Sequence, residues 1–189
     1  METGHHDTAK FARLNNPGRI EELRPAQLLK EIGSVTEGMT CVDMGSGTGV
    51  FSLPMVDLVG RTGTVHAVDT STDMLDYIRA KDPSPNLRLV QADVGRTGLA
   101  NGIADVCLLA FILHEVKAPE EVLTEAHRLL KHGGKVIIVE WSLESAKGPP
   151  LDIRIRRPKV ERMLREAGLE VGEYVDWSRN HYVITGKKP

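Results

Sequence analysis

The feature that most constrains the fold of this chain is a repeated alternation between short apolar runs and longer amphipathic stretches. Five runs are rich in β-branched residues and show little polar alternation: Met39–Asp43, Thr64–Asp69, Leu87–Gln91, Asp105–Leu109 and Lys135–Val139. This pattern predicts strands that are covered on both faces, as in a parallel sheet. Three stretches between them are long enough for crossover helices: Val50–Val59, Thr72–Lys81 and Pro119–Lys131. The sequence therefore predicts an α/β domain, doubly wound, with helices on both faces of the sheet.

Both ends of the chain depart from this alternation. Residues 1–22 are polar and rich in Asn, Gly and His, and we expect a flexible arm or a lid. Residues 23–189 are expected to form the single domain, which begins with a helix at Leu23–Gly33. Near the carboxyl end the pattern predicts a long loop at 142–158 and then a helix at Lys159–Ala167. Two strands, Leu169–Val175 and Tyr182–Thr185, are expected to form an antiparallel hairpin.

Composition limits the partners that the chain can have. Its 189 residues include 24 Lys or Arg and 26 Asp or Glu, a net charge of -2, which excludes a strongly basic nucleic-acid binder. The longest apolar run, Val106–Leu113, is far shorter than the roughly 20 residues that span a bilayer. We expect no membrane partner and, since the first residues lack a secretory pattern, a cytoplasmic protein. Cys41 and Cys107 lie in apolar segments, as expected of reduced core thiols.

A glycine-rich turn follows the first predicted strand directly. The segment Asp43-Met44-Gly45-Ser46-Gly47-Thr48-Gly49 places glycines at three alternate positions before the first crossover helix. Glycine lets the backbone turn sharply and approach a ligand without a Cβ in the way. The turn therefore fits either a nucleotide-like ligand or an ordinary strand-to-helix connection.

The next two predicted strands also end in aspartate. Asp69 ends the second strand, where a carboxylate can accept hydrogen bonds from both hydroxyls of a ribose, and Asp93 follows the third in Gln91-Ala92-Asp93. Together with Asp43, three successive strands carry a carboxylate at the edge where open α/β sheets bind ligands. The position of these residues favours a bound nucleoside over a plain turn.

These segments together resemble the class I S-adenosylmethionine-dependent methyltransferases. The likeness runs from about residue 37 to 140 and includes Asp105 at the fourth strand and Leu129-Leu130-Lys131-His132-Gly133-Gly134 before the fifth. It implies a Rossmann-like sheet of seven strands in the order 3-2-1-4-5-7-6, with the last strand antiparallel. It also implies methyl transfer from S-adenosyl-L-methionine to a small-molecule acceptor, with S-adenosyl-L-homocysteine as product.

The resemblance further implies which residues bind the cofactor. The glycine loop would hold the methionine part of the cofactor through Gly45, Ser46, Gly47 and Gly49. Asp43 would interact with the ammonium group of the cofactor or with a bound water. Asp69 and Thr70 would lie at the ribose, and Asp93 and Val94 at the adenine edge. Met74 fits either an adenine contact or the core, and the strand end at Leu109 would pass beside the methionine.

The acceptor side is less defined by the sequence. His114 follows the fourth strand in Phe111-Ile112-Leu113-His114-Glu115, and its imidazole is either a general base or a structural residue of the turn. Arg154 and Arg156 suit a carboxylate or phosphate, although a solvated basic surface is the more frequent explanation for such a charged run. With Trp141, Tyr182 and the His5-His6 arm, they are candidates for an acceptor pocket.

Two other functions stay open on the sequence alone. A nicotinamide-dependent oxidoreductase uses a similar strand, glycine turn and helix, although its usual spacing is G-x-G-x-x-G. A binding module without catalysis would retain the same acidic and glycine positions. No metal is expected, because the histidines lack ligand spacing. The sequence does not indicate the acceptor, its nucleophilic atom or the oligomeric state.

Overall fold

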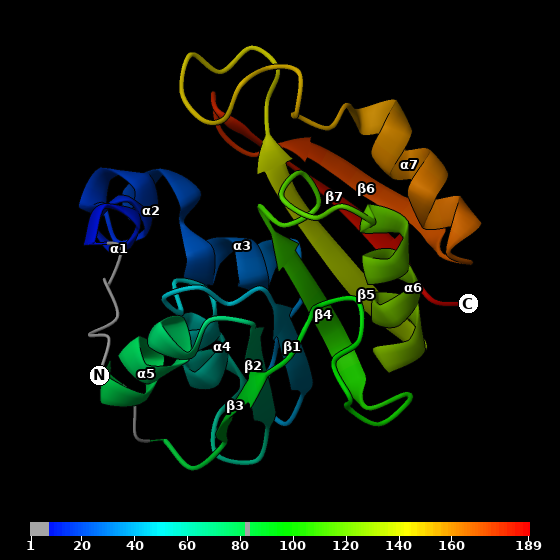
Figure 1. The fold of residues 1–189 in the computed structure, drawn as a ribbon. Coiled ribbons are helices and arrows are strands. Elements are labelled where there is room, and N and C mark those ends of the chain that lie inside the picture. Colours follow the sequence, from blue (N-terminus) through cyan, green and yellow to red (C-terminus); the bar gives the residue numbers. More distant parts are fainter. Residues whose placement is uncertain (1–7, 82–83) are drawn as a thin grey trace.

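The predicted strands form one seven-stranded sheet in the computed structural model, which describes residues 8–81 and 84–189 (Figure 1). The strands are β1 (Thr40–Met44), β2 (Thr64–Asp69), β3 (Leu87–Gln91), β4 (Ala104–Ala110), β5 (Leu130–Trp141), β6 (Glu170–Asp176) and β7 (His181–Lys187). Their order is β3-β2-β1-β4-β5-β7-β6. β7 runs antiparallel to both β5 and β6, and the other pairs are parallel. This confirms the predicted order and the antiparallel last strand.

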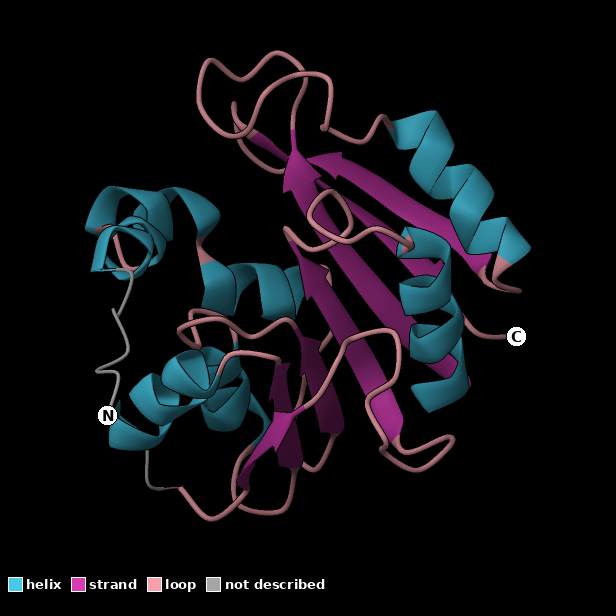
Figure 2. Cartoon of the chain, viewed as in Figure 1, coloured by secondary structure: helices cyan, strands magenta, loops and turns pink. Residues whose placement is uncertain are grey.

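Helices cover both faces of the sheet, as Figure 2 shows. They are α1 (Thr8–Leu14), α2 (Pro17–Leu23), α3 (Pro25–Glu31), α4 (Ser52–Val59), α5 (Thr72–Lys81), α6 (Pro119–Leu129) and α7 (Arg157–Glu166). Buried side chains of α3 and α4 pack on one face of the central strands, and those of α6 and α7 pack on the other. The core therefore consists of two apolar layers separated by the sheet, which leaves the carboxyl ends of the strands open between the helices.

The amphipathic pattern explains why α6 and α7 lie where they do. In α6, Val122, Ala126 and Leu129 are buried at three- and four-residue spacing, and Glu120 in the first turn complements the helix dipole. Pro119 occupies the first helical position, where the missing N–H costs nothing. The structure confirms this helix and ends it two residues earlier than the predicted Lys131.

Part of the amino-terminal segment, residues 1–22, which the sequence predicts to be a flexible arm or a lid, is helical. Residues 8–22 lie largely in α1 and α2, and Asn16 caps α2 by accepting the Arg19 N–H on its Oδ1 at 3.1 Å. Arg24, which precedes Pro25, has a φ of 47° and separates α2 from α3, so the helix predicted at Leu23–Gly33 is α3 and begins at Pro25. The Leu23 side chain is fully buried. Apolar packing therefore holds this segment on the domain, although its composition is polar. His5 and His6 lie outside the described residues.

The strand predicted at Lys135–Val139 extends in both directions. β5 runs from Leu130 to Trp141 because its pairing with β7 continues to the Trp141–His181 pair. After it, residues 142–156 form the predicted long loop, which projects beyond the sheet at the top of Figure 1.

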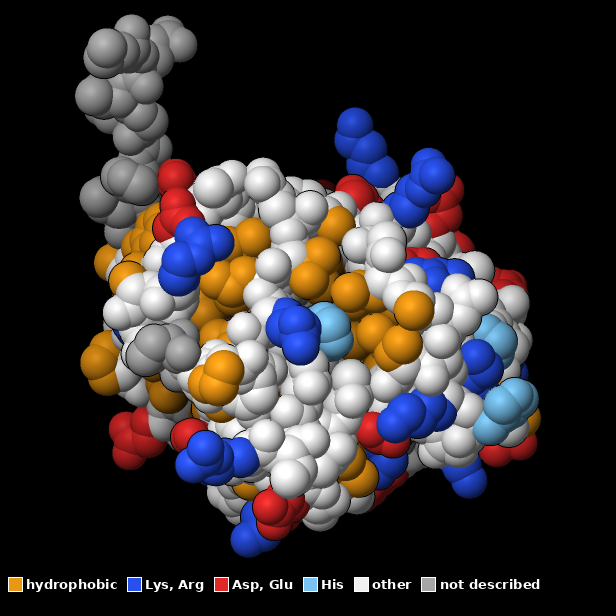
Figure 3. Space-filling model, turned by 90° about the horizontal axis from the view of Figure 1, so that it is seen from below, with side chains coloured by type: hydrophobic (Ala, Val, Ile, Leu, Met, Phe, Trp, Pro, Cys, Tyr) orange, Lys and Arg blue, Asp and Glu red, His pale blue; other side chains and the backbone are white. Residues whose placement is uncertain are grey.

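The surface and the thiols agree with the composition. The face drawn in Figure 3 carries basic and acidic side chains together, around a central band of hydrophobic ones. Cys41 and Cys107 are both buried free thiols. Within residues 8–81 and 84–189, no helix is long and apolar enough to cross a membrane.

Candidate functional site

The glycine loop (Asp43–Gly49) connects β1 to α4 in a backbone conformation that favours glycine. Gly45, Gly47 and Gly49 all have positive φ values, of 86°, 51° and 80°. The N–H groups of Gly45 and Ser46 both donate to the Val68 carbonyl, at 2.8 and 2.9 Å, so the loop is tied to the end of β2. A Cβ at Gly45 would lie 2.0 Å from the Ile112 Cδ1, whereas one at Gly47 would meet only Leu14, at 3.6 Å.

Asp69 joins the glycine loop to the turn after β2. Its Oδ2 accepts the Gly47 N–H at 2.8 Å and its Oδ1 accepts the Ser71 N–H at 2.9 Å. Each carboxylate oxygen retains a free lone pair for a further donor. The structure therefore places Asp69 against the loop that was predicted to hold the same ligand.

Asp43 is fully buried at the base of the loop. Its Oδ2 accepts the Ser52 hydroxyl at 2.6 Å. Burial raises the pKa of Asp43 to about 7, against the hydrogen bond from Ser52, and the nearby Asp69 charge raises it further. A cation bound beside Asp43 would favour its ionised form.

Two buried hydroxyls in the loop have no hydrogen-bond partner among the described residues, those of Ser46 and Thr48. Both side chains line a small cavity of about 50 Å³ together with Asp43 and Gly45. Buried polar groups are nearly always paired in folded proteins, so a bound water or ligand is expected beside these two hydroxyls. Thr48 was not among the residues predicted from the sequence.

The remaining predicted cofactor residues lie around the same sheet edge or behind it. Asp93 and Thr70 are exposed, and Asp93 Oδ1 accepts the Gly95 N–H at 2.7 Å. Met74 and Val94 are buried near the surface, and the Leu109 side chain is fully buried in the core. Only the Leu109 backbone is therefore able to face a ligand.

A large pocket of about 750 Å³ opens beside the glycine loop. It is lined by α1 and α2, by the turn after β4, by the end of β5 and by the loop that follows β5. Leu14, Arg19 and Phe111 line both this large pocket and the small cavity, so the two spaces adjoin. Phe111 has a φ of 63°, unusual for a residue with a Cβ, and its ring lies under the Arg19 guanidinium, 5.0 Å from Cζ.

His114 lines the large pocket and is bound from behind by a buried carboxylate. Its Nδ1 lies 2.7 Å from Glu140 Oε2, and the two side chains are 4% and 1% exposed. Burial lowers the pKa of His114, but the hydrogen bond and charge of Glu140 and the charge of Glu115 outweigh it, so the pKa is raised. Glu140 was not predicted, although it is an acidic residue at the end of an apolar strand, the same signal that singled out Asp43 and Asp69.

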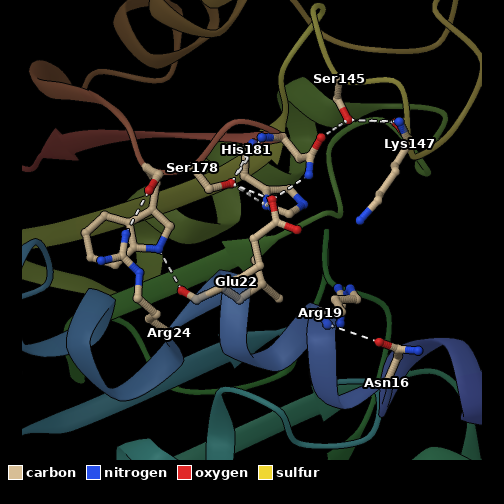
Figure 4. Close-up of polar contacts among 11 residues, drawn as sticks. Asn16, Arg19, Glu22, Arg24, Ser145, Lys147, Ser178 and His181 are labelled. Carbon is tan, nitrogen blue, oxygen red and sulfur yellow. Dashed lines mark hydrogen bonds and ion pairs between the residues drawn. The ribbon is translucent and has the colours of Figure 1, made fainter.

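Polar contacts attach α2 to the opposite side of the pocket. Figure 4 shows Glu22 pointing from α2 toward Ser178, in the connection of β6 to β7, and toward His181, the first residue of β7. The Ser178 hydroxyl donates to Glu22 Oε1 at 3.0 Å, and Arg24 Nη2 donates to the Trp177 carbonyl at 2.8 Å. The pocket wall formed by α2 is thus fixed by residues more than 150 positions away.

His181 belongs to an aromatic wall of the pocket. Its ring centroid lies 4.6 Å from that of Trp141 and 5.2 Å from that of Phe111, and the residue is 1% exposed. Burial lowers the pKa of His181 to about 4, so the imidazole is neutral at pH 7. Sequence inspection gave no signal for this residue, because its surroundings come from β4, β5 and α2.

Arg154 does not reach the large pocket, contrary to the acceptor role considered for it. Its guanidinium donates instead to four carbonyls of its own loop, those of Ser142, Ser145, Lys147 and Pro149, at 2.6 to 2.9 Å. The loop is not a strand, so the side-chain alternation assumed for Arg154 and Arg156 does not apply. Arg154 therefore shapes the loop that carries Gly148, Pro149 and Pro150 to the pocket.

Arg156 and Tyr182 are also absent from the pocket lining among the described residues. Arg156 is exposed at the start of α7. Tyr182 follows His181 in β7, so its side chain points to the other face of the sheet, where its hydroxyl donates to the Ile155 carbonyl at 2.7 Å. Of the four predicted acceptor residues, only Trp141 lines the pocket. Basic residues there come from elsewhere: Arg13, Arg19 and Lys147.

The fold and sequence are similar to those of known proteins. A family model described as a methyltransferase domain matches residues 42–138. The crystal structure of a SAM dependent methyltransferase from Aquifex aeolicus is 29% identical, with a TM-score of 0.89, and the match covers 97% of this chain and 99% of that one.

Two curated relatives show a similar level of identity. The ubiquinone/menaquinone biosynthesis C-methyltransferase UbiE of Azotobacter vinelandii is 33% identical over 150 residues, which cover 76% of this chain and 59% of that protein. The demethylmenaquinone methyltransferase of Staphylococcus aureus is 32% identical over 136 residues, covering 70% of this chain and 56% of that protein. The chain thus spans less than two thirds of the length of these relatives.

Proposed function

The chain belongs to the methyltransferase domain family of class I S-adenosylmethionine-dependent enzymes, and from that premise we propose that it transfers a methyl group from S-adenosylmethionine to a small-molecule acceptor. One observation carries the proposal. The small cavity of the glycine loop and the large pocket adjoin at Arg19 and Phe111, so a cofactor and an acceptor can meet there.

The residues of the glycine loop fit the methionine part of the cofactor. The unpartnered hydroxyls of Ser46 and Thr48 face a cavity that also exposes Asp43, a group suited to an ammonium. Arg19, in the same cavity, supplies a positive charge for the carboxylate. The open space above Gly47 admits a ligand close to the backbone.

The other predicted positions complete the proposed cofactor site. Asp69 and Thr70 would bind the ribose, and Asp93, Val94 and Met74 would surround the adenine. When bound, S-adenosylmethionine supplies a methyl group on a positively charged sulfur, which is an activated leaving group. The protein's task is then to align the acceptor and, where needed, to remove its proton.

The large pocket is the proposed acceptor site. Its walls include Phe111, Trp141 and His181, and its volume of about 750 Å³ lies in the range typical of small-molecule sites, roughly 300 to 1,000 Å³. The aromatic wall suits a flat unsaturated ring. One curated relative is named for ubiquinone and menaquinone biosynthesis and the other for demethylmenaquinone, and the quinone rings of these compounds have this shape.

Calorimetry with S-adenosylmethionine, S-adenosylhomocysteine and NADH tests the proposal. We expect the first two to bind and NADH not to bind. At 100 times its dissociation constant, a ligand stabilises the fold by about 2.7 kcal/mol, which a melting curve detects. Binding of NADH alone would favour an oxidoreductase. Binding of S-adenosylmethionine without any turnover to S-adenosylhomocysteine across an acceptor library would favour a binding module. A cytoplasmic location stays a prediction from the sequence.

A further inference from the structure

The contact between His114 and Glu140 is a built arrangement of two buried side chains. Besides the 2.7 Å contact of Oε2 with the His114 Nδ1, Glu140 Oε1 accepts the backbone N–H of His114 at 3.4 Å. One carboxylate thus holds both the ring and the backbone of the same residue. Burying a carboxylate costs free energy unless the carboxylate is paired, so Glu140 depends on its contact with His114.

The pairing fixes which ring nitrogen faces the pocket. An ionised carboxylate only accepts hydrogen bonds, so Nδ1 carries the proton in the neutral imidazole and Nε2 carries the lone pair. His114 and Glu115 both line the large pocket, and Nε2 lies 4.0 Å from Glu115 Oε1. Glu140 does not line the pocket and contacts it through two lining residues, His114 and Trp141, whose backbone N–H donates to Glu140 Oε2 at 3.4 Å.

We infer that Glu140 is a positioning residue that holds His114 with its basic Nε2 toward the acceptor pocket, and that the acceptor carries an ionisable hydroxyl whose proton His114 accepts. This inference rests on the proposed methyl transfer and deepens it. It goes beyond the presence of a histidine after β4, because it assigns an orientation, a tautomer and a class of acceptor.

The proton transfer balances within the groups named. The O–H bond of the acceptor breaks, its electron pair stays on the oxygen, and a new N–H bond forms at Nε2. The imidazolium that results is stabilised by the negative charge of Glu140 on its other nitrogen. The ionised hydroxyl is then a stronger nucleophile at oxygen or, in a phenol, at a ring carbon activated by that oxygen. Solvent finally takes the proton from Nε2.

The charged groups around the pocket act on this transfer in opposite directions. Glu140 from β5 and Glu115 from the turn after β4 favour protonated His114, while Arg13 from α1 opposes it. Arg19 and Glu22 from α2, Lys147 from the loop after β5 and His181 from β7 line the same pocket. The basic groups favour an acceptor oxyanion once it forms.

Nuclear magnetic resonance of labelled histidine tests the positioning role without cofactor. In the wild type we expect neutral His114 to carry its proton on Nδ1. In Glu140→Gln the amide group can donate to Nδ1, so we expect the opposite tautomer and a lower pKa of His114. Glu140→Asp should restore the wild-type tautomer in part. An unchanged tautomer and pKa in Glu140→Gln would overturn the inference.

Glu125→Gln is a matched control. Glu125 is also a buried glutamate, with Oε1 accepting the Thr97 N–H at 2.8 Å, but it lines neither the large pocket nor the small cavity. We expect this exchange to affect stability and to leave the His114 tautomer unchanged. A shift of the His114 signals in this variant would show that any lost carboxylate perturbs them.

Turnover with matched acceptors tests the substrate class. We expect methylation of 1,4-naphthalenediol and none of 1,4-dimethoxynaphthalene, which lacks the ionisable hydroxyls. Glu140→Gln should lower kcat by about 10² to 10⁴, the usual contribution of general-base catalysis, and should leave S-adenosylmethionine affinity unchanged. Methylation of hydroxyl-free acceptors such as aniline at a rate unaffected by Glu140→Gln would overturn the inference. If the wild type does not bind S-adenosylmethionine, the proposed function itself is contradicted.

Discussion

The glycine loop and the large pocket are adjacent in the fold but are built in different ways. The glycine loop takes its turn from glycines close together in the chain, and the Asp69 carboxylate and the Val68 carbonyl accept hydrogen bonds from its backbone. The large pocket combines side chains from α1, α2, β7 and the segments after β4 and β5, and none of these segments shapes it alone. The ligand of the first region can therefore be inferred from a short motif, whereas the ligand of the second depends on how the whole chain folds.

The two regions also use burial differently. In the glycine loop burial raises the pKa of Asp43 to about 7, and in the large pocket burial lowers the pKa of His181 to about 4. Both shifts favour the neutral form. A bound cation would ionise the Asp43 carboxyl, whereas His181 stays a neutral part of the aromatic wall.

The largest expected effect separates two glycines of the loop. Gly45→Ala should lower the free energy of unfolding by about 2 to 5 kcal/mol. The new Cβ would overlap the Ile112 side chain, and the positive φ at this position strains any residue other than glycine. Gly47→Ala should cost only about 1 to 2 kcal/mol, from backbone strain alone. Denaturant unfolding measures both. Equal losses would show that the contact with Ile112, in the turn after β4, does not shape the loop.

The pH dependence of stability should differ between the two regions. For His181, whose pKa is lowered in the fold, stability is present above the unfolded pKa of about 6.5 and is lost as the pH falls toward 4, by about 3 kcal/mol. For Asp43, whose pKa is raised, the fold instead gains stability as the pH falls from 7 to about 4.

Two non-titrating variants separate these opposing contributions. Unfolding at pH 7, 5.5 and 4 should show a shallower loss of stability on acidification in His181→Phe and a steeper one in Asp43→Asn. His132→Asn, at an exposed position, is the control for the exchange of a surface imidazole. Parallel curves for all four proteins would show that neither buried group differs between the folded and unfolded states.

Asp69 links cofactor binding to the shape of the loop. Asp69→Ala should weaken S-adenosylmethionine binding at least tenfold, or about 1.4 kcal/mol, because it removes the proposed ribose contacts and also releases the Gly47 and Ser71 N–H groups. Asp69→Asn retains one oxygen acceptor and should lose less. Calorimetry measures both affinities, and an unchanged Kd in Asp69→Ala would remove this residue from the cofactor site.

The smallest expected effects compare two arginines of the loop between β5 and α7. Arg154→Ala should cost about 1 to 2 kcal/mol and raise the KM for the acceptor, because four loop carbonyls lose a charged donor. Arg156→Ala, at an exposed position, should stay within about 0.5 kcal/mol with an unchanged KM. A larger loss of acceptor binding in Arg156→Ala would restore the role first considered for it.

The amino-acid sequence by itself determined which segments form strands and helices, most of their boundaries and the carboxylate at each of three strand ends, whereas the order of the sheet was implied by the resemblance to a known family. These features depend on local properties, since apolar periodicity, glycine positions and strand length act over a few residues. Asp43 and Asp69 could therefore be placed beside the same ligand before their contacts were known. The same reasoning applied to Glu140 would have found it, had its strand been extended to Trp141.

Only the tertiary structure decided the composition of the large pocket. Arg19, Phe111 and His181 come from three distant segments, and the pocket exists because α2 docks on the connection between β6 and β7. Tyr182 and His181 are neighbours in the sequence, yet the pleat of β7 sends one side chain to the core and the other to the pocket. The direction of a side chain relative to a distant segment is set by strand register and helix docking, and no local pattern records either.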